Sequence, residues 1–305
     1  MGCEIGCDPL YDNLRLTKSD IFSAFAFHAL ICFNSSVYVT LRKFGCKSMF
    51  VLRTIFGGEF VSNFAGINFI HRDLKSKEKI LFIISHPDDE CMFFGPAILN
   101  LTICKEKKIF LLCFSYGDYN QKGRQRKQEL WQSCSFLGIP ESNIFLQKIS
   151  VLPDDPKRMW NENVIFRIII NYVETFHFDA VVSFDKDGIS GHPNHKAIYY
   201  GLAHTLANES FPDYCSIYCL DSVNKFRKYS FILDFLFSIC FSSNWFILPP
   251  SRCYLVKKAM KAHRTQYVWF RKLYIWISRY AYINTFSLLY ANEAIFDLNF
   301  RGVCD

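Results

Sequence analysis

The most constraining feature of this 305-residue sequence is an alternation of short apolar runs and helical stretches that begins at residue 79. The runs are rich in Ile, Val and Phe and have the length of buried strands, whereas the stretches between them have helical periodicity. The predicted strands are 80–85, 109–115, 144–149 and 180–184, with 215–220 as a candidate fifth, and the predicted helices are 94–105, 124–137 and 164–176. This alternation predicts an α/β fold, a Rossmann-like, mostly parallel sheet with helices on both faces.

Two of the predicted strands run into clusters of histidine and carboxylate residues. The sequence HPDDE occupies 86–90, directly after the first strand, and HPNH occupies 192–195, where a helix opens after the fourth strand. In a parallel sheet, ligands bind outside the carboxyl ends of the strands. With the usual strand order 3-2-1-4-5, strands one and four would be neighbours, and the two clusters would then face each other.

The residue types in these clusters indicate a metal site. One imidazole and three carboxylates are costly to bury together unless they share a cation or a proton. Imidazole and carboxylate are normal zinc ligands, and a catalytic zinc site uses three of them and leaves one position open for water. Taken alone, either segment is explained more simply as a turn or as a histidine with no ligand-binding role. Both together, each at the end of a predicted strand, favour metal binding.

Composition narrows the setting of such a site. The 13 Cys are scattered without a CxxC pair, which indicates free thiols in a reducing compartment and excludes a disulfide framework. The net charge of +7 indicates an anionic partner, either a membrane surface or a phosphorylated substrate. This charge is local, because residues 251–280 contain eight Lys or Arg and no acidic residue.

The N-terminal region contains a candidate membrane segment. Residues 21–41 carry no charge, and 15 of these 21 residues are apolar, which is the length of a bilayer span. The polar members make insertion marginal, so a buried amphipathic helix is the alternative. Since more Lys and Arg follow the segment than precede it, a spanning helix would leave the bulk of the chain in the cytosol. We expect residues 1–75 to be an anchor region and 76–305 to be the functional domain.

The basic C-terminal stretch has helical periodicity. Apolar residues from Val256 to Ile277 recur at spacings of three and four, with Lys and Arg lying off this stripe. Trp269, Trp276 and Tyr280 add aromatic side chains suited to an interface. A cationic amphipathic helix of this kind favours an anionic membrane surface. A core helix with a solvated basic face is the alternative, whereas nucleic acid is not expected as a partner, because nucleic-acid binding would not predict the neighbouring hydrolytic site.

Three motifs together resemble a known family. ISHPDDE, SGHPNH and KKAMKAHRTQYVWFRKLYIWISRYAYIN are similar to motifs of the PIG-L family, the N-acetylglucosaminyl-phosphatidylinositol de-N-acetylases, and more broadly of LmbE-like zinc deacetylases. The similarity runs from about residue 80 to residue 284. It implies removal of the acetyl group from N-acetylglucosaminyl-phosphatidylinositol, the second step of glycosylphosphatidylinositol anchor synthesis, at the cytosolic face of the endoplasmic reticulum membrane.

The resemblance also implies roles for individual residues. His86, Asp89 and His195 would bind Zn²⁺ or another divalent metal, Asp88 would be the general base, and a protonated His192 would stabilise the oxyanion. These roles suit the chemistry, because zinc lowers the pKa of bound water to about 7 and polarises an amide carbonyl. A neighbouring carboxylate that does not bind the metal can take the proton of that water.

Other residues near the motifs have two possible roles. The resemblance implies that Arg126 contacts the inositol phosphate, and the alternative is a solvated pair with Glu129 on a helix face. Asp185 and Asp187 are expected to accept hydrogen bonds from the histidines, or else to stabilise only their own loop. The LPDDP segment at 152–156 is interpreted chiefly as a turn.

Two questions stay open at this stage. Ser190 stands where bacterial relatives with soluble substrates carry a Tyr, so either Asp88 or His192 is expected to protonate the leaving amine. Two alternative functions are deacetylation of a soluble amino sugar and a non-catalytic lipid-binding scaffold. The intact histidine and carboxylate set argues against the scaffold, and the basic C-terminal stretch favours a lipid-linked substrate over a soluble one.

Overall fold

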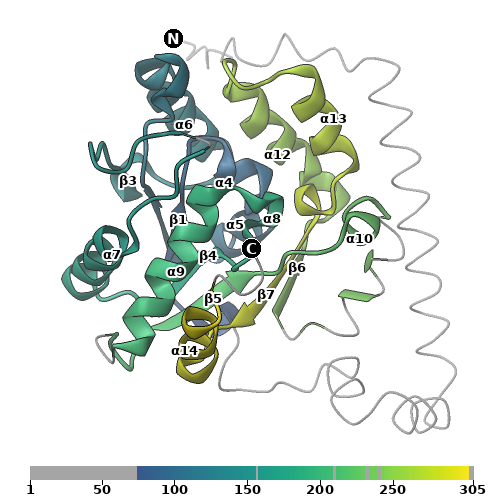
Figure 1. Ribbon diagram of the computed structural model, residues 1–305. Coiled ribbons are helices and arrows are strands. Elements are labelled where there is room, and N and C mark those ends of the chain that lie inside the picture. The colour runs from purple at the N-terminus through teal and green to yellow at the C-terminus, as the bar shows by residue number, and fades with distance from the viewer. Residues whose placement is uncertain are drawn as a thin grey trace, which may run out of the picture. The chain divides into compact units, whose positions relative to one another are not determined.

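A seven-stranded mixed sheet organises the part of the chain that the computed structural model describes, which is residues 74–301 apart from 156, 209–210, 231–233, 236, 239–241 and 243 (Figure 1). The strands are β1 (Lys79–Ile84), β2 (Lys108–Cys113), β3 (Ile144–Leu146), β4 (Ala180–Phe184), β5 (Ser216–Leu220), β6 (Asn244–Ile247) and β7 (Ile283–Leu288). The helices are α4 (Asp89–Met92), α5 (Gly95–Thr102), α6 (Gly123–Leu137), α7 (Glu162–Phe176), α8 (Gly188–Gly191), α9 (Pro193–Ala207), α10 (Lys225–Tyr229), α12 (Pro250–Ala262), α13 (Trp269–Ile277) and α14 (Ala291–Asn299). Short 3-10 turns occupy Leu74–Ser76, Asp118–Asn120, Glu141–Asn143 and Arg279–Ala281.

The strand order is β3-β2-β1-β4-β5-β7-β6, which confirms the predicted order for the first five strands. β1 lies between β2 and β4 and is parallel to both, with Phe82 beside Val182 in the register. The sheet is therefore mostly parallel, as predicted. β7 and β6 extend it in antiparallel directions, and the sequence analysis missed both strands.

The two faces of the sheet are covered by different helices, as the alternation of β1 requires. Leu81 and Ile83 belong to a buried cluster that includes residues of α7, α9 and α14. Phe82, between them, points to the other face and meets the ring of Phe94, with the centroids 5.8 Å apart. α5, α6 and α12 lie on that second side, so the sheet has helices on both faces, as predicted (Figure 1).

The C-terminal stripe forms two helices, so the prediction of one continuous amphipathic helix is wrong. α12 ends at Ala262 and α13 begins at Trp269. Val256 and Met260 are buried in the core, whereas Phe270 is 53% exposed. Between the two helices, the side chains of His263 and Thr265 contact Glu90 and Glu129. The apolar spacing of three and four residues continues through this break, so periodicity alone does not detect it.

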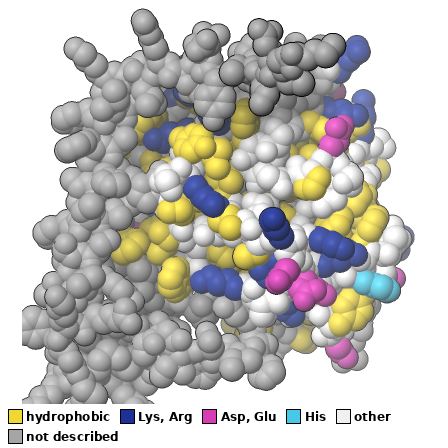
Figure 2. Space-filling view, turned by 180° about the vertical axis from the view of Figure 1, so that it is seen from behind, with side chains coloured by type: hydrophobic (Ala, Val, Ile, Leu, Met, Phe, Trp, Pro, Cys, Tyr) yellow, Lys and Arg dark blue, Asp and Glu magenta, His cyan; other side chains and the backbone are white. Residues whose placement is uncertain are grey.

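The predicted membrane segment 21–41 lies outside the described residues, as does the rest of the expected anchor region up to residue 73. Within the described part, no helix combines the length and the apolar character needed to cross a bilayer. Seen from behind, the described surface mixes Lys and Arg with apolar side chains (Figure 2).

Candidate active site

The ends of β1 and β4 bring the two histidine clusters together. The ring centroid of His86 lies 4.9 Å from that of His192 and 5.8 Å from that of His195. Each of these three imidazoles offers a nitrogen within 4.8 Å of the other two. Asn194 also contacts His86, with 3.1 Å between Nδ2 and Nε2. Two segments more than 100 residues apart therefore form one site, as the predicted strand order requires.

Asp89 lies between two of the histidines. Its Oδ1 is 3.3 Å from Nε2 of His195, and its Oδ2 is 3.7 Å from Nδ1 of His86. Two atoms bound to one tetrahedral ion by bonds of ~2.0–2.1 Å stand roughly 3.3 Å apart, so the separation between Asp89 and His195 suits a shared ion, whereas the contact with His86 is longer and uses the other oxygen. Burial alone would raise the pKa of Asp89, but His195 and His86 lower this pKa well below its usual range. The carboxylate is therefore an anion with two imidazoles facing it.

The other nitrogens of these two histidines have partners of their own. His86 Nε2 lies 2.9 Å from Oδ1 of Asp154, and His195 Nδ1 lies 3.1 Å from the carbonyl oxygen of Gly188. Such partners set the tautomer and the ring orientation of metal-binding histidines. Phe184 stacks on His195 with the ring centroids 3.9 Å apart and the planes 3° from parallel. Both imidazoles are thus held with one nitrogen facing Asp89.

Strained backbone flanks the site on both strand ends. Asp88 has a φ of 120° and Ile189 a φ of 60°, which are backbone angles that residues other than glycine rarely adopt. The N–H of Asp88 donates to Oε2 of Glu90 at 3.0 Å, which helps to hold this conformation. Gly188 also has a positive φ, and a Cβ there would lie 2.9 Å from Cβ of His195. Glycine at this position allows the loop after β4 to approach the histidine.

Asp88 faces the same cavity and is flanked by two guanidinium groups. Arg126 Nη2 lies 3.4 Å from its Oδ1, and Arg271 Nη2 lies 3.2 Å from its Oδ2. Burial raises the pKa of Asp88, and the two arginines oppose that shift. The described residues give Oδ2 no hydrogen bond of good geometry. This oxygen is therefore placed to accept a proton from a substrate or a water molecule.

Arg126 and Glu129 are both buried, so the alternative of a solvated pair on a helix face is wrong. Arg126 donates to the carbonyl oxygens of Gly117, at 3.0 Å, and Pro87, at 2.6 Å. Gly117 has a φ of +66°, and a Cβ there would lie 2.3 Å from the guanidinium. Glu129 accepts hydrogen bonds from the N–H and the hydroxyl of Thr265. Arg126 thus supports the loop after β1, and its contact with an inositol phosphate stays a prediction.

His192 is neutral in this environment, which corrects the expectation of a protonated imidazole. Burial, followed by the neighbouring His86 and His195, lowers the pKa of His192 to about 4. Its Nδ1 accepts the N–H of Asn194 at 3.2 Å and so caps helix α9. With Nδ1 acting as an acceptor, the neutral ring carries its proton on Nε2. His192 can therefore donate a hydrogen bond at neutral pH without carrying a charge.

Asp185 and Asp187 do not make the contacts with histidines that the sequence analysis expected. Asp185 accepts hydrogen bonds from the N–H of Gly188, at 3.0 Å, and from the N–H and hydroxyl of Ser222, at 2.5 and 2.6 Å. The structure gives Asp187 no hydrogen bond to the site histidines. The carbonyl of Gly188, and not a carboxylate, accepts from His195. Asp185 therefore does not contact His195 directly. It accepts a hydrogen bond from Gly188, and the carbonyl of Gly188 contacts His195.

A fully buried pair, which sequence reasoning missed, lies behind Asp88. His263 Nε2 is 2.6 Å from Oε1 of Glu90, and the hydroxyl of Ser133 donates to the same oxygen at 2.5 Å. Burial opposes both charges, but each partner offsets it, so the pKa of Glu90 is lowered and that of His263 is raised. No local signal marks this role, because His263 reads as one member of an apolar stripe. Asp154, in the LPDDP segment, was interpreted chiefly as part of a turn because its partner His86 is distant in the sequence.

The site opens into a cavity of about 620 Å³, within the usual range for a small-molecule pocket. The histidines and aspartates described above form part of its lining. Residues of α10 and α13 also line it, and these are Lys228, Tyr229, Trp269, Phe270, Arg271, Leu273, Tyr274 and Ile277. Several of these are apolar and well exposed, and Trp269 is 75% exposed. The cavity therefore combines polar catalytic residues with an apolar rim.

The fold resembles that of a deacetylase of known structure, and the sequence matches a deacetylase family. The fold is similar to that of N,N'-diacetylchitobiose deacetylase from Pyrococcus horikoshii, with a TM-score of 0.55 and 15% identity over 73% of this chain and 86% of that one. The family model of PIG-L, GlcNAc-PI de-N-acetylase, matches residues 81–206.

Two relatives bear the name N-acetylglucosaminyl-phosphatidylinositol de-N-acetylase, one of them as a probable assignment. The Bos taurus protein is 40% identical over 212 residues, covering 69% of this chain and 83% of the relative. The probable enzyme of Dictyostelium discoideum is 33% identical over 243 residues, covering 68% and 92%. The chain belongs to the PIG-L family and is an amidohydrolase of the deacetylase class.

Replacing His263 tests the buried pair. The change His263→Ala would leave the Glu90 carboxylate buried without its partner, and we expect a loss of ~3–5 kcal/mol in the free energy of unfolding. His263→Gln keeps a donor and should lose less. Denaturant unfolding of the purified protein measures both variants, with the exposed Lys261→Ala on the same helix as the control. An unchanged midpoint for His263→Ala would contradict the structural role of this pair.

Proposed function

We propose that this protein hydrolyses the acetamide of N-acetylglucosaminyl-phosphatidylinositol, releasing acetate and the free amine, as the second step of glycosylphosphatidylinositol anchor synthesis. The observation that carries the proposal is the meeting of His86, Asp89 and His195 beside the carboxylate of Asp88. The names of the relatives supply the substrate. The cavity is large enough for a sugar, and its apolar rim suits a substrate that carries acyl chains.

His86, Asp89 and His195 would hold the metal ion of this reaction. The fit rests on three features: the 3.3 and 3.7 Å separations around Asp89, the anionic state of that carboxylate, and the partners that orient both imidazoles. Two imidazoles and one carboxylate favour zinc, with another divalent metal as the alternative. A bound zinc ion supplies a water of lowered pKa and a polarised acetamide carbonyl.

Asp88 would move the protons of the reaction. Its Oδ2, free of hydrogen bonds, would take the proton of the attacking water, while Arg126 and Arg271 hold the carboxylate in place. The same carboxyl group would then deliver the proton to the leaving amine, with His192 as the other candidate donor. The Nε2–H of neutral His192 would donate to the oxygen on which charge develops, a contribution of ~3–4 kcal/mol for one such donor.

The membrane setting is part of the proposal. We assign the protein to the endoplasmic reticulum membrane, with the domain from residue 76 onward facing the cytosol and residues 21–41 as a candidate anchor. The scattered cysteines and the exposed aromatic side chains of α13 support this assignment. In sealed microsomes, protease added outside should digest this domain, and protection that ends only when detergent is added would contradict the orientation.

The change Asp88→Asn tests the general base. An amide cannot accept the water proton, so we expect acetate release from the glycolipid to fall by about 10²-fold or more while the bound metal is retained. Acetate is measured enzymatically and metal content by mass spectrometry. Asp213→Asn is the matched control, because Asp213 is exposed and is not among the residues that line the cavity. Turnover of Asp88→Asn at the wild-type rate would refute the assignment.

The change His195→Ala tests the metal ligands. One ligand of three would be lost, so we expect metal content and acetate release to fall together. His204→Ala on the same helix, where the side chain pairs with Glu162 instead, should keep both. A chelator should abolish the activity of the wild-type protein, and added Zn²⁺ should restore it. Full metal content in His195→Ala would show that this histidine is not a ligand.

A further inference from the structure

One cation in the cavity wall has no anionic partner in the described part of the chain. Lys228 lies on α10 and lines the cavity together with the site residues. Its Nζ lies 5.1 Å from the ring centroid of Tyr274, 5.8 Å from that of Tyr280 and 5.9 Å from that of Tyr229. No described carboxylate comes within 4.0 Å of this ammonium.

The other cations near the cavity are already paired. Arg126 and Arg271 both contact Asp88. Arg227, the neighbour of Lys228 on α10, pairs with Asp234 at 2.8 Å. An incoming anion would therefore compete with an existing ion pair at each of these guanidinium groups, but not at Lys228.

The position of Lys228 is costly without an anion. Burial lowers the pKa of Lys228, which means that the charged form is poorly solvated there. Three tyrosine faces attract a cation but do not neutralise it. The hydroxyl of Tyr280 accepts the N–H of Val223, at 3.1 Å, and donates to the carbonyl of Asp221, at 2.9 Å. The ring of Tyr280, 5.8 Å from the ammonium, is thus held in place.

We propose that Lys228 binds the phosphodiester of the glycolipid substrate in this cavity. This assignment rests on the proposed function. The rings of Phe93 and Tyr274 connect His195 to Lys228: the centroid of Phe93 lies 5.6 Å from that of His195 and 6.0 Å from that of Tyr274, and the Tyr274 centroid lies 5.1 Å from Nζ of Lys228. With the sugar at the histidines, the inositol would lie along these rings and the phosphate would meet Lys228. The exposed apolar side chains of α13, such as Trp269 and Phe270, also line the cavity, and the acyl chains would leave it along them.

The kinetic test compares two substrates in neutral detergent micelles, which contain no anionic lipid. One is N-acetylglucosaminyl-phosphatidylinositol, and the other is N-acetylglucosaminyl-inositol, which lacks the phosphodiester. In the full chain, Lys228→Met should raise KM for the first substrate about tenfold or more, with kcat nearly unchanged. It should leave KM for the second substrate unchanged. Lys228→Arg should restore much of the affinity for the phosphodiester.

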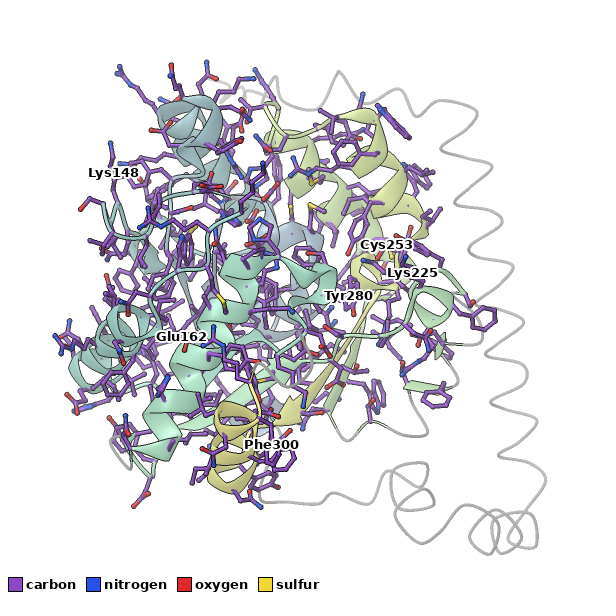
Figure 3. All side chains as sticks on the ribbon, viewed as in Figure 1. Lys148, Glu162, Lys225, Cys253, Tyr280 and Phe300 are labelled. Atoms are coloured by element: carbon purple, nitrogen blue, oxygen red, sulfur yellow. The ribbon has the colours of Figure 1, made fainter. Side chains whose placement is uncertain are left out.

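Lys225→Met is the matched control, because Lys225 lies one turn earlier on α10, is exposed and is not among the residues that line the cavity. Figure 3 labels Lys225 on this helix. A binding arm that needs no turnover uses calorimetry with glycerophosphoinositol, which Lys228→Met should bind about tenfold more weakly than the wild-type protein does. Thermal unfolding confirms that each variant is folded.

The outcomes separate the two proposals. If the wild-type protein releases no acetate from the glycolipid, the proposed function fails, and the binding arm still tests Lys228. If the wild-type protein is active and Lys228→Met keeps the same KM and the same affinity for glycerophosphoinositol, the role of Lys228 is overturned. An equal rise in KM for both substrates would also overturn it, because that result would place Lys228 in general substrate binding.

Discussion

The structure depends on one electrostatic constraint, the burial of Asp89 between two imidazoles at the ends of adjacent parallel strands. An isolated carboxylate at this depth would be strongly destabilising. His195 and His86 offset that cost, but only if β1 and β4 are neighbours and their loops meet. The strand order is therefore coupled to the chemistry. The strained φ angles of Asp88 and Ile189 are consistent with this view, because both lie in the loops that must close around the same carboxylate.

A second layer of contacts ties the C-terminal helices to the catalytic loop. His263 directly follows α12 and pairs with Glu90, which accepts the N–H of Asp88, while Thr265 in the following turn donates to Glu129. The break between α12 and α13 is thus fixed by side chains of the site region. Because of this break, α13 can turn back over the cavity and bring Arg271 to Asp88.

The sequence predicted those features that are local and missed those that depend on distant partners. The first five strands, their order and the convergence of His86 and His195 follow from short apolar runs and from the geometry of parallel sheets. By contrast, the residues around Asp154 do not indicate that Asp154 contacts His86. Likewise, β6 and β7 pair through residues that lie far apart in the chain. The helix break at His263 was missed because the apolar spacing continues across it. Protonation of His192 was mispredicted because a motif does not reveal that two other imidazoles crowd the ring.

The charged groups that line the cavity differ in whether they have partners within the protein. The carboxylates of Asp88, Asp89 and Asp154 gather at the sheet end, where cationic and hydrogen-bond-donating groups are required to keep them buried. Arg126 and Arg271 meet that requirement for Asp88, so both guanidinium groups are already paired with a carboxylate of the protein. A neutral His192 adds a donor without adding repulsion to the neighbouring imidazoles. Among the described Lys and Arg residues that line the cavity, only Lys228 lacks a carboxylate partner. An anionic substrate would therefore be oriented with its phosphate at Lys228 and its amide at the carboxylates.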